Sequence, residues 1–119
     1  MSRLGNILNE LVGTRTTLAT GATLIRSDKN RKLILNGYTK TASNLTIPSA
    51  DAPSVETSVA GLRTDSNGRS TALARATIYA SQTNVAMYYA GAYNASGSGL
   101  SSLANGDKIF AVLEWVVGT

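Results

Sequence analysis

Short β-prone runs alternate with turn residues along most of the sequence, a pattern typical of an all-β domain. Gly, Pro, Asn, Asp, Ser or Thr stands in each gap between these runs, and no helical periodicity separates them. This organisation favours a sandwich or barrel over alternating strands and helices. We predict strands at Thr16–Ile25, Lys32–Thr39, Asn44–Ile47, Val55–Arg63, Thr71–Ala80, Asn84–Ala90 and Lys108–Val117.

The N-terminal residues show a different, helical pattern. Apolar residues recur there at positions that share one helix face, and the pattern closes at Gly13. A helix of about ten residues is marginal in water, so it must pack on its own domain or on copies of itself. The spacing of Leu4, Leu8 and Leu11 favours packing around a symmetry axis. We therefore predict a short neck at residues 1–13 and a β domain at residues 14–119.

The last strand is apolar on both faces. Ile109, Ala111, Leu113, Trp115 and Val117 share one face, whereas Phe110, Val112, Glu114 and Val116 share the other. An antiparallel strand at the surface of a monomer alternates apolar with polar residues, so something must cover the second face. We expect another subunit to do so. A central strand buried on both faces within one chain is the alternative.

Glu114 requires a partner, because a carboxylate among apolar neighbours is costly unless it is paired. Arg63 and Arg75 are the candidates that we consider. A carboxyl group with a raised catalytic pKa is the other reading of this position.

Composition narrows the classes of function. The chain has 119 residues, which suits one domain, and only 15% are charged against the roughly 25% of average domains. No apolar run approaches the roughly 20 residues of a membrane span, so we expect no membrane insertion. Since Cys and His are both absent, we expect no disulfide, zinc site or other cofactor. The usual catalytic base and nucleophile are missing too, and we predict that the protein is not an enzyme.

A basic segment, Arg26–Lys32, raises the question of nucleic-acid binding. Asp28 interrupts its charge, and no nearby aromatic residue offers the base stacking that single-strand binders use. We interpret the segment as a solvated turn and expect no nucleic-acid partner.

The candidate ligand-binding residues lie in or beside two loops, where binding residues on β scaffolds tend to occur. Aromatic faces and polar side chains of this kind suit a saccharide. The alternative is that the tyrosines pack on the sheet and the polar residues form turns. The candidates are Tyr89, Tyr93 and Asn94, beside the long loop that ends at Asp107, and Arg63, Asp65 and Arg69 around the other.

The order of these features resembles the C-terminal head domains of tailed-bacteriophage receptor-binding and tail-fibre proteins. The residues that carry the resemblance are the neck-like Arg3–Leu11, the passage from Leu45 to Pro53, the turn Asp65–Gly68 and the closing strand Ile109–Val117. The resemblance implies a trimeric, jelly-roll-like antiparallel β-sandwich at the tail of a virion. It further implies non-catalytic binding to a bacterial cell-surface saccharide.

Two other families share this architecture. A viral capsid or decoration protein of jelly-roll type would turn the basic segment Arg26–Lys32 toward nucleic acid. A trimeric ligand of the tumour-necrosis-factor or C1q kind is the second alternative, and its usual features are a signal peptide for export and a membrane or collagen stem.

Overall fold

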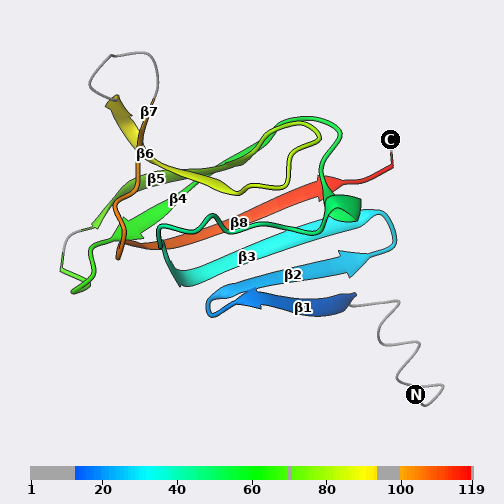
Figure 1. Ribbon diagram of the computed structural model, residues 1–119, viewed down its shortest axis with the longest axis horizontal. Helices are drawn as coiled ribbons and strands as arrows, with labels where there is room; N and C mark the ends of the chain where they lie inside the picture. Colours follow the sequence, from blue (N-terminus) through cyan, green and yellow to red (C-terminus); the bar gives the residue numbers. More distant parts are fainter. Residues whose placement is uncertain (1–12, 70, 94–99, 119) are drawn as a thin grey trace.

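The fold is all-β, as predicted. A computed structural model describes residues 13–69, 71–93 and 100–118. Within these ranges eight strands form one antiparallel sheet in the order β1-β2-β3-β8-β4-β5-β6-β7 (Figure 1). They are β1 (Thr14–Ala19), β2 (Ala22–Ser27), β3 (Asn30–Thr39), β4 (Thr57–Thr64), β5 (Thr71–Ile78), β6 (Ala86–Tyr93), β7 (Leu100–Ser102) and β8 (Lys108–Val116).

The finer predictions of architecture have different outcomes. A two-sheet jelly roll is not confirmed, because the described strands are joined in one continuous hydrogen-bonded sheet. The predicted N-terminal helix falls in residues 1–12, outside the described ranges. In the part of the chain that the structure describes, no helix is long and apolar enough to cross a membrane.

The prediction of one strand over Thr16–Ile25 is wrong, because a hairpin divides this segment. Strands β1 and β2 pair up to Ala19 and Ala22, which leaves Thr20 and Gly21 as the connection. Gly21 has a φ of +82°, and a Cβ there would lie 2.9 Å from the backbone nitrogen of Tyr38. Only glycine fits such a turn without strain.

The predicted strand Asn44–Ile47 is also wrong, and one strand was missed. Residues 40–56 cross one face of the sheet, and their only strand-like pairing is a bridge from Thr46 to Asn84. The missed strand is β7, which lies in the segment predicted to be a long loop.

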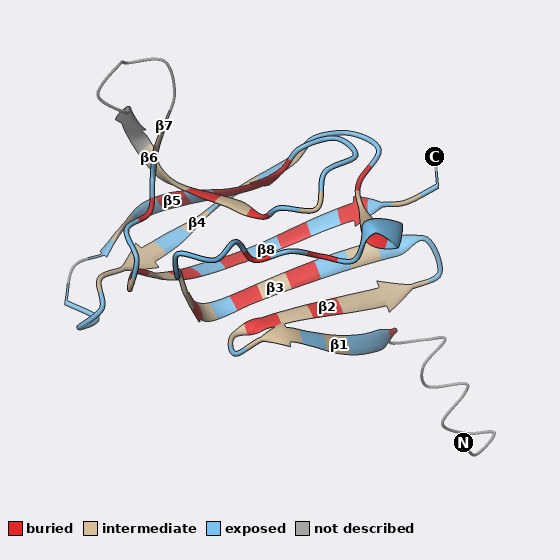
Figure 2. Ribbon diagram, in the orientation of Figure 1, coloured by how far each residue is buried: buried red, intermediate tan, exposed pale blue. Residues whose placement is uncertain are grey.

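Strand β8 lies in the middle of the sheet, between β3 and β4. Its buried residues alternate with exposed ones, and along β3 the buried Leu33 and Leu35 stand on either side of a half-buried residue (Figure 2). Ile109 and Leu113 are fully buried on the covered face together with Leu33 of β3. The period-2 pattern therefore correctly predicted which residues share a face.

The covered face packs against the crossing segment 40–56 and the strand-to-strand turn that follows β5. Leu45 and Ile47 are buried in this layer, together with Ile78 and Val85 from the turn's flanks. Backbone hydrogen bonds fasten the segment there, from the Ile47 N–H to the Thr83 carbonyl (3.0 Å) and from the Val85 N–H to the Leu45 carbonyl (2.9 Å). The single core of the described chain lies between this layer and the central strands. The opposite face of the sheet has no such cover within the described residues, and we call it the open face.

Candidate functional site

The loop end of the sheet, where β4 and β6 finish and β8 begins, contains an ionic cluster. Arg63 of β4, Tyr89 of β6 and Asp107 before β8 come together there. The Tyr89 hydroxyl donates a 2.6 Å hydrogen bond to Asp107 Oδ2. Arg63 Nε lies 3.3 Å from the same oxygen, and the guanidinium carbon lies 5.0 Å from the centre of the Tyr89 ring.

Asp107 is buried, and its pKa is lowered in spite of that. Burial alone raises the pKa of a carboxyl group. Hydrogen bonds from the Tyr89 hydroxyl, from Arg63 and from the backbone N–H of Ala104 outweigh burial and favour the carboxylate. The cluster therefore holds a charged Asp107 against β4 and β6 and fixes the turn at residues 103–107.

The predicted loop residues divide between this cluster and a neighbouring turn. Arg63 and Tyr89 direct their polar atoms at Asp107. Asp65 Oδ1 accepts hydrogen bonds from the backbone N–H groups of Asn67 (3.1 Å) and Arg69 (2.8 Å), which is the turn role considered for it. The Arg69 side chain is exposed.

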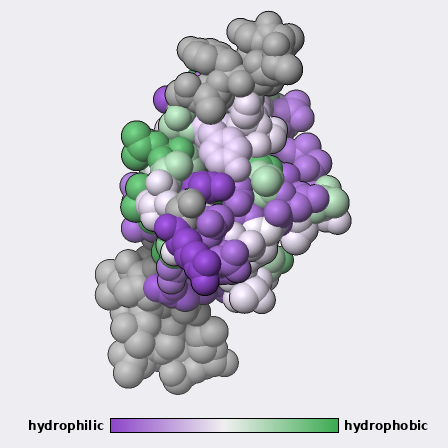
Figure 3. Space-filling model, turned by 90° about the vertical axis from the view of Figure 1, so that its left-hand side faces the viewer, coloured by the Kyte–Doolittle hydropathy of each residue, from purple (hydrophilic) through white to green (hydrophobic). Residues whose placement is uncertain are grey.

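The two turns at the loop end are adjacent. A Cβ placed on Gly106 would lie 3.5 Å from the Cβ of Ser66. Tyr93 ends β6 at the same end of the sheet, although only its backbone is described, and Asn94 lies outside the described residues. Viewed from this end, the surface is mostly hydrophilic, and hydrophobic residues gather along one flank (Figure 3).

A second ionic cluster lies at the opposite end, centred on Asp51 of the short 3-10 helix η1 (Ser49–Asp51). Asp51 is 2% exposed. It accepts hydrogen bonds from Arg26 Nε (2.9 Å), Arg26 Nη2 (2.7 Å) and Arg31 Nε (2.7 Å). The Trp115 indole N–H donates to the Asp51 backbone oxygen at 2.7 Å, so the crossing segment is locked onto β8.

The interpretation of Arg26–Lys32 as a solvated turn holds for Asp28 and Lys29, which are exposed between β2 and β3, but not for the two arginines. Arg26 and Arg31 bind a buried carboxylate, and Lys32 lies 3.3 Å from Glu114. Hydrogen bonds from Arg26 are the largest cause of a lowered pKa at Asp51. Only Lys29 of the four basic residues in the segment lacks an ion pair within the described chain.

Four exposed apolar side chains adjoin one another on the open face, and we call them the open-face patch: Leu62, Leu73, Phe110 and Val112. Leu73 pairs with Leu62 across β5 and β4, and Leu62 pairs with Phe110 across β4 and β8. The patch thus runs over three neighbouring strands, with exposed fractions from 38% at Phe110 to 63% at Leu73.

The sequence left open whether the second apolar face of the last strand is buried within one chain. The outward positions of β8 decide this. Phe110, Val112, Glu114 and Val116 all lie on the open face, and Val116 is 42% exposed. The alternative of a strand buried on both faces within one chain is therefore wrong. Within the chain, Glu114 pairs with Lys32 on the adjacent strand and not with Arg63 or Arg75, whereas pairing with an arginine of a neighbouring subunit stays a prediction. Leu4, Leu8 and Leu11, the other predicted interface residues, lie outside the described residues.

Sequence reasoning missed the two buried aspartates that organise the molecule. Asp107 stands in the sequence directly before the most apolar strand. That position could have indicated that its carboxylate holds the start of the strand in place. Asp51 lies between two prolines, Pro48 and Pro53, with no local pattern that reveals its partners. Among the described residues no cluster of acidic side chains could hold a metal ion.

Comparison with known proteins adds no relative. No protein-family model, no curated protein and no solved structure matches the chain. Function must therefore be argued from the open face and the loop end themselves.

Proposed function

We propose that the protein is a non-catalytic recognition subunit of a homo-oligomer. In this proposal it assembles through the open-face patch and presents its loop end to a bacterial cell-surface saccharide, as a bacteriophage receptor-binding head does. The trimer, the jelly-roll sandwich and the location on a virion tail belong to the same proposal.

The observation that carries the proposal is the open-face patch. Four large apolar side chains adjoin one another on a regular sheet, whereas a sheet with one solvated face normally carries polar residues there. Sheets pack face to face at about 10 Å, so a second subunit could complete a sandwich over the patch. Arg75 pairs in register with Ala60 on this face and supplies a polar border.

The turns of the loop end are held in place, and this supports the proposal that the loop end binds a saccharide. The Arg63–Tyr89–Asp107 cluster fixes the turn at 103–107. Asp65 fixes its own turn, and the two turns are adjacent at Ser66 and Gly106. Ordered loops on a β scaffold bind with a smaller entropy cost than loose ones.

Light scattering at micromolar concentration tests the assembly. We expect the wild type to be oligomeric and Val112→Glu to shift it toward the monomer, because the substitution places a charge in the patch. Val55→Glu is the matched control: Val55 is 72% exposed and outside the patch, so the oligomer should persist. A wild-type monomer would refute assembly through this face.

Binding to a glycan panel and to intact bacterial cells tests recognition. We expect saturable binding that changes little with added salt, and a loss of affinity in Arg69→Ala. Lys29→Ala is the control, because Lys29 lies at the opposite end of the sheet in the β2–β3 turn. Binding to nucleic acid that weakens steeply with salt would instead support the capsid or decoration alternative. The ion pairs of Arg26 and Arg31 count against that alternative.

A further inference from the structure

A groove of about 540 Å³ lies on the open face, beyond the open-face patch and away from the loop end. Its floor is a cross-strand row of four side chains at one register. Arg15 of β1 pairs with Ile25 of β2, Ile25 with Lys32 of β3, and Lys32 with Glu114 of β8. The next row contains Ser27, Asn30 and Val116, which also line the groove.

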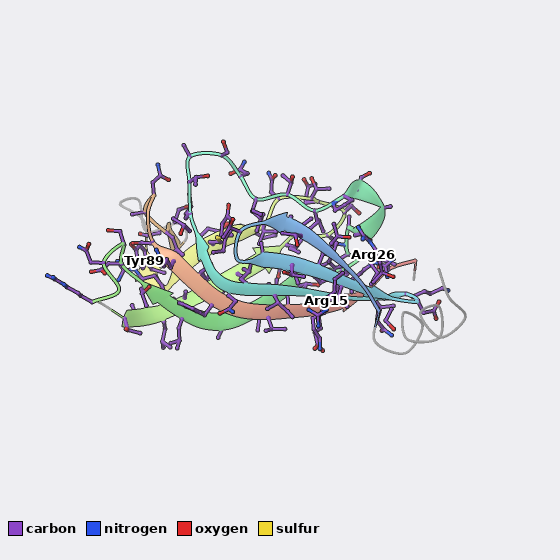
Figure 4. All side chains as sticks on the ribbon, turned by 90° about the horizontal axis from the view of Figure 1, so that it is seen from below. Arg15, Arg26 and Tyr89 are labelled. Atoms are coloured by element: carbon purple, nitrogen blue, oxygen red, sulfur yellow. The ribbon has the colours of Figure 1, made fainter. Side chains whose placement is uncertain are left out.

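The charges of the groove favour an anion. Arg15 is exposed, and within the described residues its guanidinium has no ion pair or hydrogen bond. Figure 4 shows Arg15 on the side of the sheet opposite to Arg26, which points toward η1. On that other side, Arg26 and Arg31 share the single carboxylate of Asp51, so that cluster has one positive charge in excess. Lys32 and Glu114 neutralise each other at 3.3 Å.

The uncharged residues of the groove restrict the chemical class of ligand further. Ile25 and Val116 offer an apolar surface, whereas Ser27 and Asn30 offer hydroxyl and amide groups. Glu114 has a side chain that is 65% exposed and can accept hydrogen bonds from ligand hydroxyls. The volume lies within the roughly 300–1,000 Å³ of small-molecule sites. A ligand that suits all these groups has a carboxylate, several hydroxyls and a C–H face.

We propose that this groove binds an acidic sugar unit, a hexuronate, with Arg15 holding its carboxylate. Lys32, Asn30 and Glu114 hydrogen-bond its hydroxyls, and Ile25 contacts its C–H face. The groove is an additional site, distinct from the loop end of the proposed function. The inference that the groove binds a hexuronate does not depend on which saccharide the loop end recognises.

Fluorescence of Trp115, the only tryptophan of the chain, gives the readout, because Trp115 lies between Glu114 and Val116 of the groove on β8 while its indole packs on the covered face. The test titrates the full chain with glucuronate, and with glucose and inorganic sulfate as comparison ligands. We expect glucuronate to bind at least about tenfold more tightly than either, since a charge-assisted hydrogen bond contributes roughly a factor of ten. Equal affinity for glucose would overturn the role of the carboxylate, and equal affinity for sulfate would overturn the sugar class.

Two substitutions that should change glucuronate affinity in opposite directions test the roles given to Arg15 and Glu114. Arg15→Gln should weaken glucuronate binding about tenfold. Glu114→Gln should strengthen it, because Lys32 loses its competing carboxylate while the side-chain oxygen remains an acceptor. Lys40→Gln is the control and should bind like the wild type, because Lys40 follows the end of β3 that lies away from the groove. Unchanged affinity in Arg15→Gln would overturn the proposal.

The location of binding separates this site from the loop end. Amide chemical shifts of Ile25, Lys32 and Glu114 should change on addition of glucuronate. Shifts confined to residues 63–69 and 103–107 would overturn the groove while supporting the loop end. No binding in a wild-type sample that light scattering shows to be oligomeric would overturn the groove and leave assembly intact.

Discussion

Replacing Asp51 with Asn should destabilise the protein severely. The side chain accepts three charge-assisted hydrogen bonds and is 3% exposed. Removing one partner of a buried ion pair typically costs about 3–5 kcal/mol, because the remaining charge stays buried. The side chain of Arg26 is 29% exposed and can regain some hydration, whereas that of Arg31 is 12% exposed. We therefore expect a loss of about 3 kcal/mol in the free energy of unfolding at pH 7.

Urea denaturation followed by Trp115 fluorescence is the assay, because the indole N–H donates to the Asp51 backbone oxygen. With an m-value of about 1.5 kcal/mol/M, the midpoint should fall by about 2 M urea. Protein concentration must be the same in all samples, since oligomerisation contributes to apparent stability. Glu56→Gln is the control, because Glu56 is exposed, and its effect should stay within about 0.5 kcal/mol.

The pH dependence has a defined sign. The pKa of Asp51 is lowered from its ordinary value of 3.8, chiefly by hydrogen bonds from Arg26. Its stabilising contribution is therefore fully present above the unfolded pKa and is lost as pH falls through the lower folded pKa. The difference between wild type and Asp51→Asn should be constant above about pH 5 and shrink in acid. A loss below about 1 kcal/mol at pH 7, or a difference independent of pH, would refute the assignment.

Two further substitutions test the loop end and the sheet. Asp107→Asn should lower the free energy of unfolding in urea by about 2–3 kcal/mol. Tyr89→Phe should lower it by only about 1 kcal/mol, because the Ala104 N–H still donates to the carboxylate and Arg63 still pairs with it; equal losses would contradict this ranking. Gly61→Ala should cost about 2–3 kcal/mol by the same assay, because its Cβ would lie 2.4 Å from the Phe110 backbone oxygen. A Gly61→Ala protein as stable as the wild type would show that β4 can move away from β8.

The sequence by itself determined the class of fold and the faces of the strongest strand. Alternation along residues 108–117 placed Ile109 and Leu113 on one face and Phe110 and Val112 on the other, and the structure has the same division. The absence of Cys and His restricted the available chemistry without any coordinates. These properties are local, because the side-chain period of a strand is fixed by its own backbone.

Only the tertiary structure decided which face is covered and which charges meet. Asp51 binds Arg26, 25 residues away in the sequence, and Arg31, 20 residues away. Asp107 binds Arg63, 44 residues away. Strand register alone aligns Arg15, on the first strand, with Glu114 on the last, through the two strands between them. A period-2 pattern shows which residues share a face, but the cover over that face comes from segments distant in the chain. Local propensity does not encode such pairings, and so the groove and both buried aspartates emerge only from the folded sheet.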